Sequence, residues 1–389
     1  MLALAAVSGV SPFATDTYLA ALPTVGSDLG AGAGATQLTM TAFLVGFAVG
    51  QLVFGPFSDG LGRRRILIGC SAAFAVTSLL CAAAPDVLTL IALRALEGAA
   101  GGCGLAVGRA VVSDRYDGAD AAARYGMLAS ITLVAPVLAP AIGGAILLVG
   151  DWRAVFVFLA GLGVLMTLGV LIGIPETLPP DARSPAGPGE TGRRLGAVLR
   201  MRPFLAAVVV QCLATAGFFA YIGGSSFVLQ GAMGLSPAEY SVLFASNAAA
   251  MVVVSLVFTA TARRVTPQRW RAVGLLTSTV GATALALYAA FVDDVHLLPV
   301  WVLLAVSVAG MGLSIPASTA IAQHLGRAVG GTASAVQGGL SFAVGAAATP
   351  LTGLTGQTSV AGMSVVMTVL LALSCGVLLV TARSTPSPP

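Results

Sequence analysis

Three ionisable side chains lie well inside long apolar runs of the sequence: Asp16, Arg94 and Glu97. A charge at such a position is costly within a membrane and by default marks a functional site. Burial disfavours the charged form of a carboxylate, whereas a nearby guanidinium favours it. An acid whose distance from a cation changes can therefore load and release a proton, and we predict that these three residues take part in proton coupling.

The spacing of the three residues predicts a shared location. Glu97 follows Arg94 by three positions, which places both on one face of a helix. Asp16 lies roughly 5 Å and Arg94 roughly 8 Å from the middle of their apolar runs, on the same side if successive runs cross in opposite directions. We expect the acid and the Arg–Glu pair to line one water-filled cavity. The alternative is that Arg94 and Glu97 neutralise each other as a structural pair.

Aromatic residues supply the candidate substrate contacts. Phe218, Phe219 and Tyr221 lie together beside two glycines in one apolar run. Aromatic side chains on a helix loosened by glycine suit a pocket for flat or greasy molecules, although core packing explains them equally well. Tyr18, two positions after Asp16, and Asn247, one of few amides in the apolar runs, complete the predicted substrate-binding set.

A polar segment with the sequence GPFSDGLGRRR, residues 55–65, separates two apolar runs. Its glycines predict a tight turn, Asp59 is expected to cap a helix N-terminus, and Arg63 is expected to pair with Asp114 or Asp117. Such contacts would form a latch if only one conformational state made them; alternatively, the arginines only fix topology. In another run, Pro140 and the glycines after it permit a kink and close helix contact. The predicted gating set is Gly55, Asp59, Gly62, Arg63, Arg64, Arg109, Asp114, Asp117, Pro140, Gly143 and Gly144.

Composition identifies the elements that must position these residues. Of the 389 residues 57% are hydrophobic and only 9% charged, against about 25% charged in soluble domains. A membrane span needs roughly 20 apolar residues, so the chain has room for about a dozen and for no separate enzyme domain. Cutting at charged, glycine-rich and proline-rich segments predicts twelve spans, at 2–24, 38–54, 66–84, 87–112, 124–149, 153–174, 204–230, 239–262, 270–291, 297–322, 330–355 and 360–382.

The arginines predict the orientation of these spans. If residues 55–65 face the cytoplasm, sixteen of the nineteen arginines lie on the cytoplasmic side and only Arg153 lies opposite. This bias predicts a multi-pass protein with both termini in the cytoplasm. The proline-rich and charged segment 175–203 is expected to be a cytoplasmic linker between six-helix bundles at 1–174 and 204–382, and residues 383–389 a disordered tail.

Signatures of other chemistry are missing from the sequence. No H-E-x-x-H or G-x-x-x-x-G-K-[ST] motif is present, and the five cysteines lie in apolar runs without a C-x-x-C pair. We therefore predict no enzyme activity, no metal and no cofactor, and expect an ion gradient to supply the energy. Arginine clusters between apolar helices report topology, so nucleic acid is not an expected partner.

Several segments of the sequence together carry a family resemblance: DTYLAALP (16–23), QLVFGPFSDGLGRRR (51–65), LIALRALEG (90–98), LAPAIGG (138–144), WRAVF (152–156), PETLPP (175–180), and FVLQ and GLSP (within 227–237). Over nearly its whole length the chain resembles the major facilitator superfamily and, within it, the bicyclomycin and chloramphenicol resistance (Bcr/CflA) group of drug:proton antiporters. The loop motif alone indicates only the superfamily, whereas the combination of segments is more specific.

The resemblance implies a twelve-helix, monomeric antiporter of the bacterial inner membrane that exports small hydrophobic or cationic compounds against protons. Asp16 would be the protonation site, Arg94 the arginine of the proton-coupling motif, and Pro140, Gly143 and Gly144 the antiporter motif. Glu97 departs from the group, which usually has glutamine there. The alternative is a proton-coupled symporter or an exporter of a small metabolite such as a sugar or amino acid. A membrane-embedded enzyme or receptor would need a catalytic cluster or a large extramembrane domain.

Overall fold

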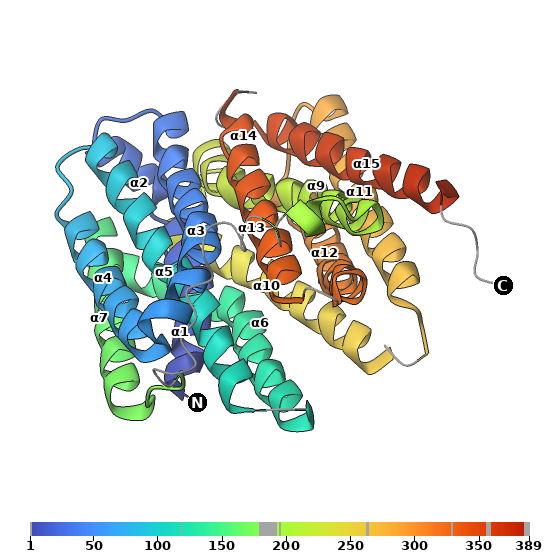
Figure 1. Cartoon of the computed structure of the whole chain (residues 1–389). Helices are drawn as coiled ribbons and strands as arrows, with labels where there is room; N and C mark the ends of the chain where they lie inside the picture. The colour runs from blue at the N-terminus through green and yellow to red at the C-terminus, as the bar shows by residue number, and fades with distance from the viewer. Residues whose placement is uncertain are drawn as a thin grey trace. The chain divides into compact units, whose positions relative to one another are not determined.

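The computed structural model describes residues 2–116, 118–178, 193, 196–261, 264–327, 330–354 and 359–384, and every regular element in these ranges is helical (Figure 1). The elements are α1 (Leu2–Leu19), α2 (Leu22–Asp28), α3 (Ala33–Leu61), α4 (Arg63–Ala82), α5 (Val87–Arg115), α6 (Gly118–Val149), α7 (Trp152–Gly173), α9 (Arg202–Ser226), the π-helical turn η2 (Phe227–Ala232), α10 (Pro237–Thr261), α11 (Pro267–Phe291), α12 (Leu297–Leu325), α13 (Gly330–Ala348), α14 (Leu351–Leu354) and α15 (Val360–Ser384).

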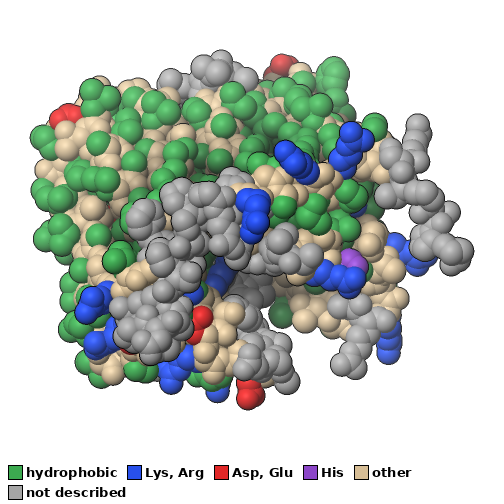
Figure 2. Space-filling view, viewed as in Figure 1, with side chains coloured by type: hydrophobic (Ala, Val, Ile, Leu, Met, Phe, Trp, Pro, Cys, Tyr) green, Lys and Arg blue, Asp and Glu red, His purple; other side chains and the backbone are tan. Residues whose placement is uncertain are grey.

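Each of the twelve predicted apolar runs contains one long helix in these ranges. Nine helices of the described part are long and apolar enough to cross a membrane, and α6 contributes a shorter apolar stretch, Val134–Val149. Hydrophobic side chains cover most of the face seen in Figure 2, and many leucines and valines are exposed. An apolar exterior of this kind suits lipid rather than water, and the prediction of an all-α membrane protein is confirmed.

The turn expected over residues 55–65 is much shorter than predicted. Helix α3 continues through Gly55 and Gly60 to Leu61, and α4 starts at Arg63. Gly62 alone turns the chain, with a φ of 94° that side-chain-bearing residues rarely adopt. The expectation that all three glycines form the turn was therefore wrong, because a single left-handed residue reverses the chain.

Three predicted runs are interrupted, and the eleventh run divides into α13 and α14. The first run divides into α1 and α2, and Pro23 lies in the first turn of α2, where a missing N–H costs nothing. The seventh run ends in η2, whose wider π-helical winding follows directly after Ser226. Such π-helical turns are frequent at functional sites.

The chain forms two compact units, described separately here. Unit 1 comprises Met1–Arg193 with Pro237–Val242, and unit 2 comprises Arg194–Ser236 with Leu243–Pro389. Most of the predicted linker, and residues 385–389 of the predicted tail, lie outside the described residues. The boundaries of the predicted bundles therefore stay a prediction.

Helices α3 and α5 of unit 1 pack with their backbones in contact. A Cβ added at Gly46 or Gly50 would overlap the carbonyl of Ala95 or Ala99, respectively. The same holds in the opposite direction, where Gly98 and Gly102 of α5 abut the carbonyls of Phe43 and Phe47. Small residues at i and i+4 on both helices allow this approach, which fixes α5 and its charged pair against α3.

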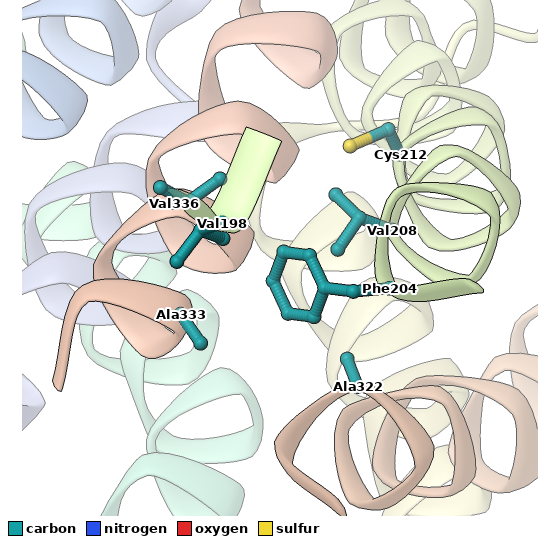
Figure 3. Packing of buried hydrophobic residues seen from close by; sticks show 7 residues of the cluster. All are labelled: Val198, Phe204, Val208, Cys212, Ala322, Ala333 and Val336. Atoms are coloured by element: carbon teal, nitrogen blue, oxygen red, sulfur yellow. The ribbon is translucent and has the colours of Figure 1, made fainter. Parts of the chain in front are cut away.

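In unit 2 a buried apolar cluster holds the beginning of α9 in place. Phe204 and Val208 of α9 pack with Ala322 of α12 and with Ala333 of α13 (Figure 3). Val198, just before α9, is fully buried in the same cluster. This end of unit 2 therefore has its own hydrophobic core.

Candidate functional site

Arg94 lies at the centre of unit 1 and is completely buried. Its Nη1 donates to Glu97 Oε2 across 2.7 Å and its Nη2 donates to the carbonyl of Ala14 across 3.1 Å. The guanidinium carbon lies 4.3 Å from the ring centre of Phe43 and 5.0 Å from that of Tyr18. Cation–π contacts gain strength when they are desolvated. One side chain thus connects α5 to α1 and α3.

Glu97 is also completely buried and faces α4. Besides Arg94, it accepts a hydrogen bond of 2.6 Å from the Ser78 hydroxyl, and the Cys81 thiol lies 3.9 Å from its second oxygen. A carboxylate with a guanidinium and a hydroxyl as donors is well compensated for burial. This geometry supports the structural-pair alternative for Arg94 and Glu97, and their part in proton coupling stays a prediction.

Asp16 lies on α1, is 6% exposed, and accepts a hydrogen bond of 2.8 Å from the neighbouring Thr15 hydroxyl. Within the described ranges it has no ion-pair partner. Arg94 contacts the backbone of α1 two residues earlier, at Ala14, instead of the carboxylate. The structure thus brings Arg94 to the helix that carries Asp16, but the two charges are not paired. Arg94 and Glu97 are enclosed by protein.

The backbone of α1 near Asp16 is touched by α6. A Cβ added at Gly143 would overlap the carbonyl of Thr17, so only glycine fits this contact. Pro140 lies one turn earlier on α6, and both it and Gly144 are buried. The residues of the predicted antiporter motif therefore lie against the segment of α1 that contains the acid.

Tyr18 is fully buried in unit 1. Its hydroxyl lies 3.1 Å from the Thr39 hydroxyl, and its ring centre lies 5.1 Å from that of Phe156. These contacts are those of a packed core side chain, and a role of Tyr18 in substrate binding stays a prediction.

The aromatic residues predicted in unit 2 belong to a larger stack. The rings of Tyr221 and Phe244 lie parallel, 5.4 Å apart and inclined by 7°, and Phe218 stacks on Tyr221 at 6.2 Å. Asn247 donates from Nδ2 to the Tyr221 hydroxyl across 3.2 Å, and its buried Oδ1 has no hydrogen-bond partner in the part of the chain that the structure describes.

Phe219 is not part of the parallel stack, and its ring lies against Phe342 on α13. Sequence reasoning missed Phe244, although it lies three positions before Asn247, on the same helix face.

The turn at Gly62 is held by ion pairs and caps. Arg63 Nε lies 3.0 Å from Asp114 Oδ2, one of the two predicted pairings, and its guanidinium also contacts the Ser58 hydroxyl. Arg64 donates to the carbonyls of Ile174 and Leu171 at the end of α7. The predicted roles of Asp59, Asp117 and Gly55 cannot be compared with the structure, because Asp117 and the surroundings of Gly55 and Asp59 lie outside its description. Arg109 is exposed.

A residue that sequence reasoning missed completes this cluster. Glu176 accepts a hydrogen bond of 2.9 Å from the backbone N–H of Arg63, the first residue of α4. A carboxylate at a helix N-terminus is favoured by the helix dipole. Thr177 donates to Asp114 Oδ2 across 3.1 Å, so the segment after α7 contacts both α4 and α5. The segment PETLPP was noted as part of the family resemblance and of the linker, but no contact of Glu176 was predicted.

A second charged cluster lies at the end of α2. Asp28 accepts hydrogen bonds from the Arg153 guanidinium and from the Trp152 indole, the latter across 2.9 Å. These two donors hold the pKa of Asp28 below its ordinary value. The cluster joins α2 to the beginning of α7.

Comparison with known proteins identifies the family. The model of the Major Facilitator Superfamily matches residues 4–350. The chain belongs to the Major Facilitator Superfamily. It is therefore a multi-pass membrane transporter, and members of this superfamily are transporters rather than enzymes.

Two relatives illustrate the range of similarity within the superfamily. The chain is 33% identical over 362 residues to the uncharacterized MFS-type transporter YdgK of Bacillus subtilis, covering 92% of this chain and 89% of that protein. It is 30% identical over 244 residues to the multidrug resistance protein MdtL of Escherichia coli, an alignment that covers 63% of this chain and 61% of MdtL. A multidrug transporter is thus among the relatives, while the narrower Bcr/CflA grouping stays a prediction.

Solved structures show the same fold. The xylose transporter XylE of Escherichia coli matches with a TM-score of 0.74 at 14% identity, covering 99% of this chain and 97% of XylE. A bacterial homologue of the human lysosomal transporter Spinster matches with a TM-score of 0.76 at 16% identity, covering 100% and 98%. The predicted major facilitator fold is confirmed.

Proposed function

We propose that this transporter exports small hydrophobic or cationic compounds from the bacterial cytoplasm in exchange for protons, by alternating access, as a member of the Bcr/CflA group. The observation that carries the proposal is Asp16, a buried acid of α1 without an ion-pair partner among the described residues. Unpaired acids within membrane spans are rare and are typical of proton relays. Similarity to a multidrug resistance protein supports drugs as the cargo.

In the proposed cycle Asp16 binds a proton from outside the cell and releases it when drug binds from the cytoplasm. Arg94 acts as a fixed cation beside α1, since Glu97, Ala14 and the surrounding rings hold its guanidinium. Glu97 contributes to coupling by positioning Arg94. The predicted gating residues around Gly62 and on α6 would then permit the change of state.

We assign substrate contact to the aromatic stack of Phe218, Tyr221 and Phe244, with Asn247 at its edge. The unpartnered Oδ1 of Asn247 offers an acceptor to a cargo that carries an N–H or O–H group. Phe219 and Tyr18 stay in the proposed set on the strength of the sequence alone. We further propose a monomer in the inner membrane with both termini in the cytoplasm.

Drug-evoked proton release from the purified protein in detergent tests the coupling. Wild type is expected to acidify a weakly buffered solution on binding a transported drug, and Asp16→Asn is expected to release no proton. Asp28→Asn, which removes an exposed acid of the same unit, is the matched control and should release as many protons per drug as wild type. Full proton release and full-rate efflux by Asp16→Asn would refute the assignment of Asp16. A cargo whose binding takes up a proton would indicate symport instead.

Drug-binding measurements on the whole protein, with substitutions in unit 2, test the substrate assignment. Tyr221→Ala is expected to weaken drug binding by about tenfold, from the loss of one stacked aromatic contact. Phe291→Ala is the control, because Phe291 lies at the end of α11 and is 83% exposed. This variant should not change drug binding. Equal affinity of both variants would place the drug elsewhere.

A further inference from the structure

Arg271 is a buried cation that has no counter-charge among the residues that the structure describes. It lies in the second turn of α11, is 9% exposed, and its Nε has no hydrogen-bond partner within the described ranges. A guanidinium stays protonated in proteins, and a buried charge is stable only when something compensates it. The described side chains do not supply that compensation.

The sequence of unit 2 offers no acid for this role. Its only Asp or Glu side chains are Asp293 and Asp294, which follow the opposite end of α11. At 1.5 Å per residue, Asp293 lies roughly 30 Å from Arg271 along the helix, well beyond a screening length of about 8 Å. The compensating anion must therefore come from outside unit 2.

Helix packing shows where Arg271 points. Gly274, one turn later on the same face of α11, lies against the backbone of Ser314 in α12. Arg271 therefore lies along the seam between α11 and α12, next to the turn of α12 that follows Ser314 and includes Ser318. Both serine hydroxyls are buried and have no hydrogen-bond partner in the described structure.

Near the middle of this seam, the two buried serine hydroxyls both have hydrogen-bond partners. Ser278 donates to the carbonyl of Ser307 across 2.7 Å, and Ser307 donates to the carbonyl of Ser278 across 3.0 Å. Unmet polar groups are thus concentrated at the Arg271 end. The indole N–H of Trp270 is likewise buried and unpartnered there, within the described residues.

The surroundings of Arg271 select the kind of anion. Arg264 and Arg269 are exposed nearby and extend the positive charge to the surface. The arginine bias of the sequence places this end of unit 2 at the cytoplasmic leaflet, whose anionic lipids are attracted to basic residues. Fixing topology explains exposed arginines, but it does not explain a buried one beside unpartnered hydroxyls.

We propose that the α11–α12 seam binds the phosphate of an anionic phospholipid from the cytoplasmic leaflet. Arg271 donates to the phosphate oxygens as the principal contact, with the Trp270 indole and the Ser318 hydroxyl as further donors. This site lies within unit 2 and is independent of the proton site on α1.

Lipid titration of the full-length, delipidated protein in detergent tests the proposal by native mass spectrometry. Phosphatidylglycerol is expected to bind wild type, and phosphatidylcholine to bind at least tenfold more weakly. Arg271→Gln should weaken phosphatidylglycerol binding by about tenfold or more, since it removes a charged hydrogen-bond donor. Arg269→Gln is the control: it removes one arginine charge from an exposed position two residues before Arg271. This variant should change phosphatidylglycerol binding less than threefold. Equal binding in both variants and wild type, or equal loss in both, would overturn the site.

Two further experiments distinguish lipid from free phosphate and locate the bound lipid without a variant. Inorganic phosphate at millimolar concentration is expected not to displace phosphatidylglycerol; if it does, the site binds free phosphate instead of lipid. A photoactivatable phosphatidylglycerol analogue on wild type needs no variant, and so covers the case in which Arg271→Gln fails to fold. Labelling is expected at the beginning of α11 and the end of α12, and uniform labelling of all lipid-facing helices would refute the proposal.

Discussion

The Arg94 guanidinium lies 2.7 Å from the Glu97 carboxylate, and neither side chain is exposed. Removing one member of a buried ion pair leaves the other charge uncompensated, which costs about 3–5 kcal/mol. The pair therefore behaves as one neutral unit held between α4 and α1.

Glu97→Ala is accordingly expected to lower the free energy of unfolding by about 3–5 kcal/mol. Glu97→Gln should cost less, because its amide oxygen still accepts from Arg94. Thermal unfolding in detergent measures the difference. If Glu97 only positions Arg94, the number of protons released per drug by Glu97→Gln will equal that of wild type. One proton fewer per drug would show that Glu97 itself titrates.

The backbone contact between α3 and α5 makes Gly98 sensitive to any side chain. Gly98→Ala would force a methyl group into the carbonyl of Phe43 and is expected to destabilise unit 1 by about 1–3 kcal/mol. Gly69→Ala on α4 is the matched control, since a Cβ there meets nothing within 4 Å, and it should leave the melting temperature unchanged or raised. Equal melting temperatures of the two variants would contradict the close contact.

Glu176 at the beginning of α4 predicts a capping effect. Glu176→Ala removes the acceptor for the Arg63 backbone N–H and should cost about 1 kcal/mol, the usual value of a helix cap. Glu176→Gln retains an acceptor oxygen and should recover part of the loss. Hydrogen exchange at the first turn of α4 would report the change directly. Unchanged protection in Glu176→Ala would show that water caps the helix equally well.

The Asp28 cluster predicts a dependence of stability on pH. Because Arg153 and Trp152 lower the pKa of Asp28 in the folded state, its contribution is fully present above the unfolded pKa of about 3.9 and is lost as pH falls through the folded pKa. Asp28→Asn is therefore expected to melt below wild type at pH 6, and the difference should shrink as pH falls below about 3.9 and through the folded pKa. A difference that is constant over this range would exclude the carboxylate charge as its source.

The sequence predicted the helices well because each span is long, apolar and bounded by charged or proline-rich segments, and these are local properties. The pairing of Arg63 with Asp114 could also be anticipated, since few acids lie near that turn. Glu176, by contrast, meets Arg63 across 113 positions, and no local pattern specifies that contact. The continuation of α3 through Gly55 was missed because glycine only weakens a helix and does not forbid one.

The interlock of α3 with α5 constrains how the protein changes shape. Four glycine-to-carbonyl contacts leave neither helix room to slip past its partner by a single residue. The two helices must therefore move together as one rigid body, and Arg94 moves with them. Within unit 1, a change in the surroundings of Asp16 is then expected where α1 meets this helix pair, α6 or α7.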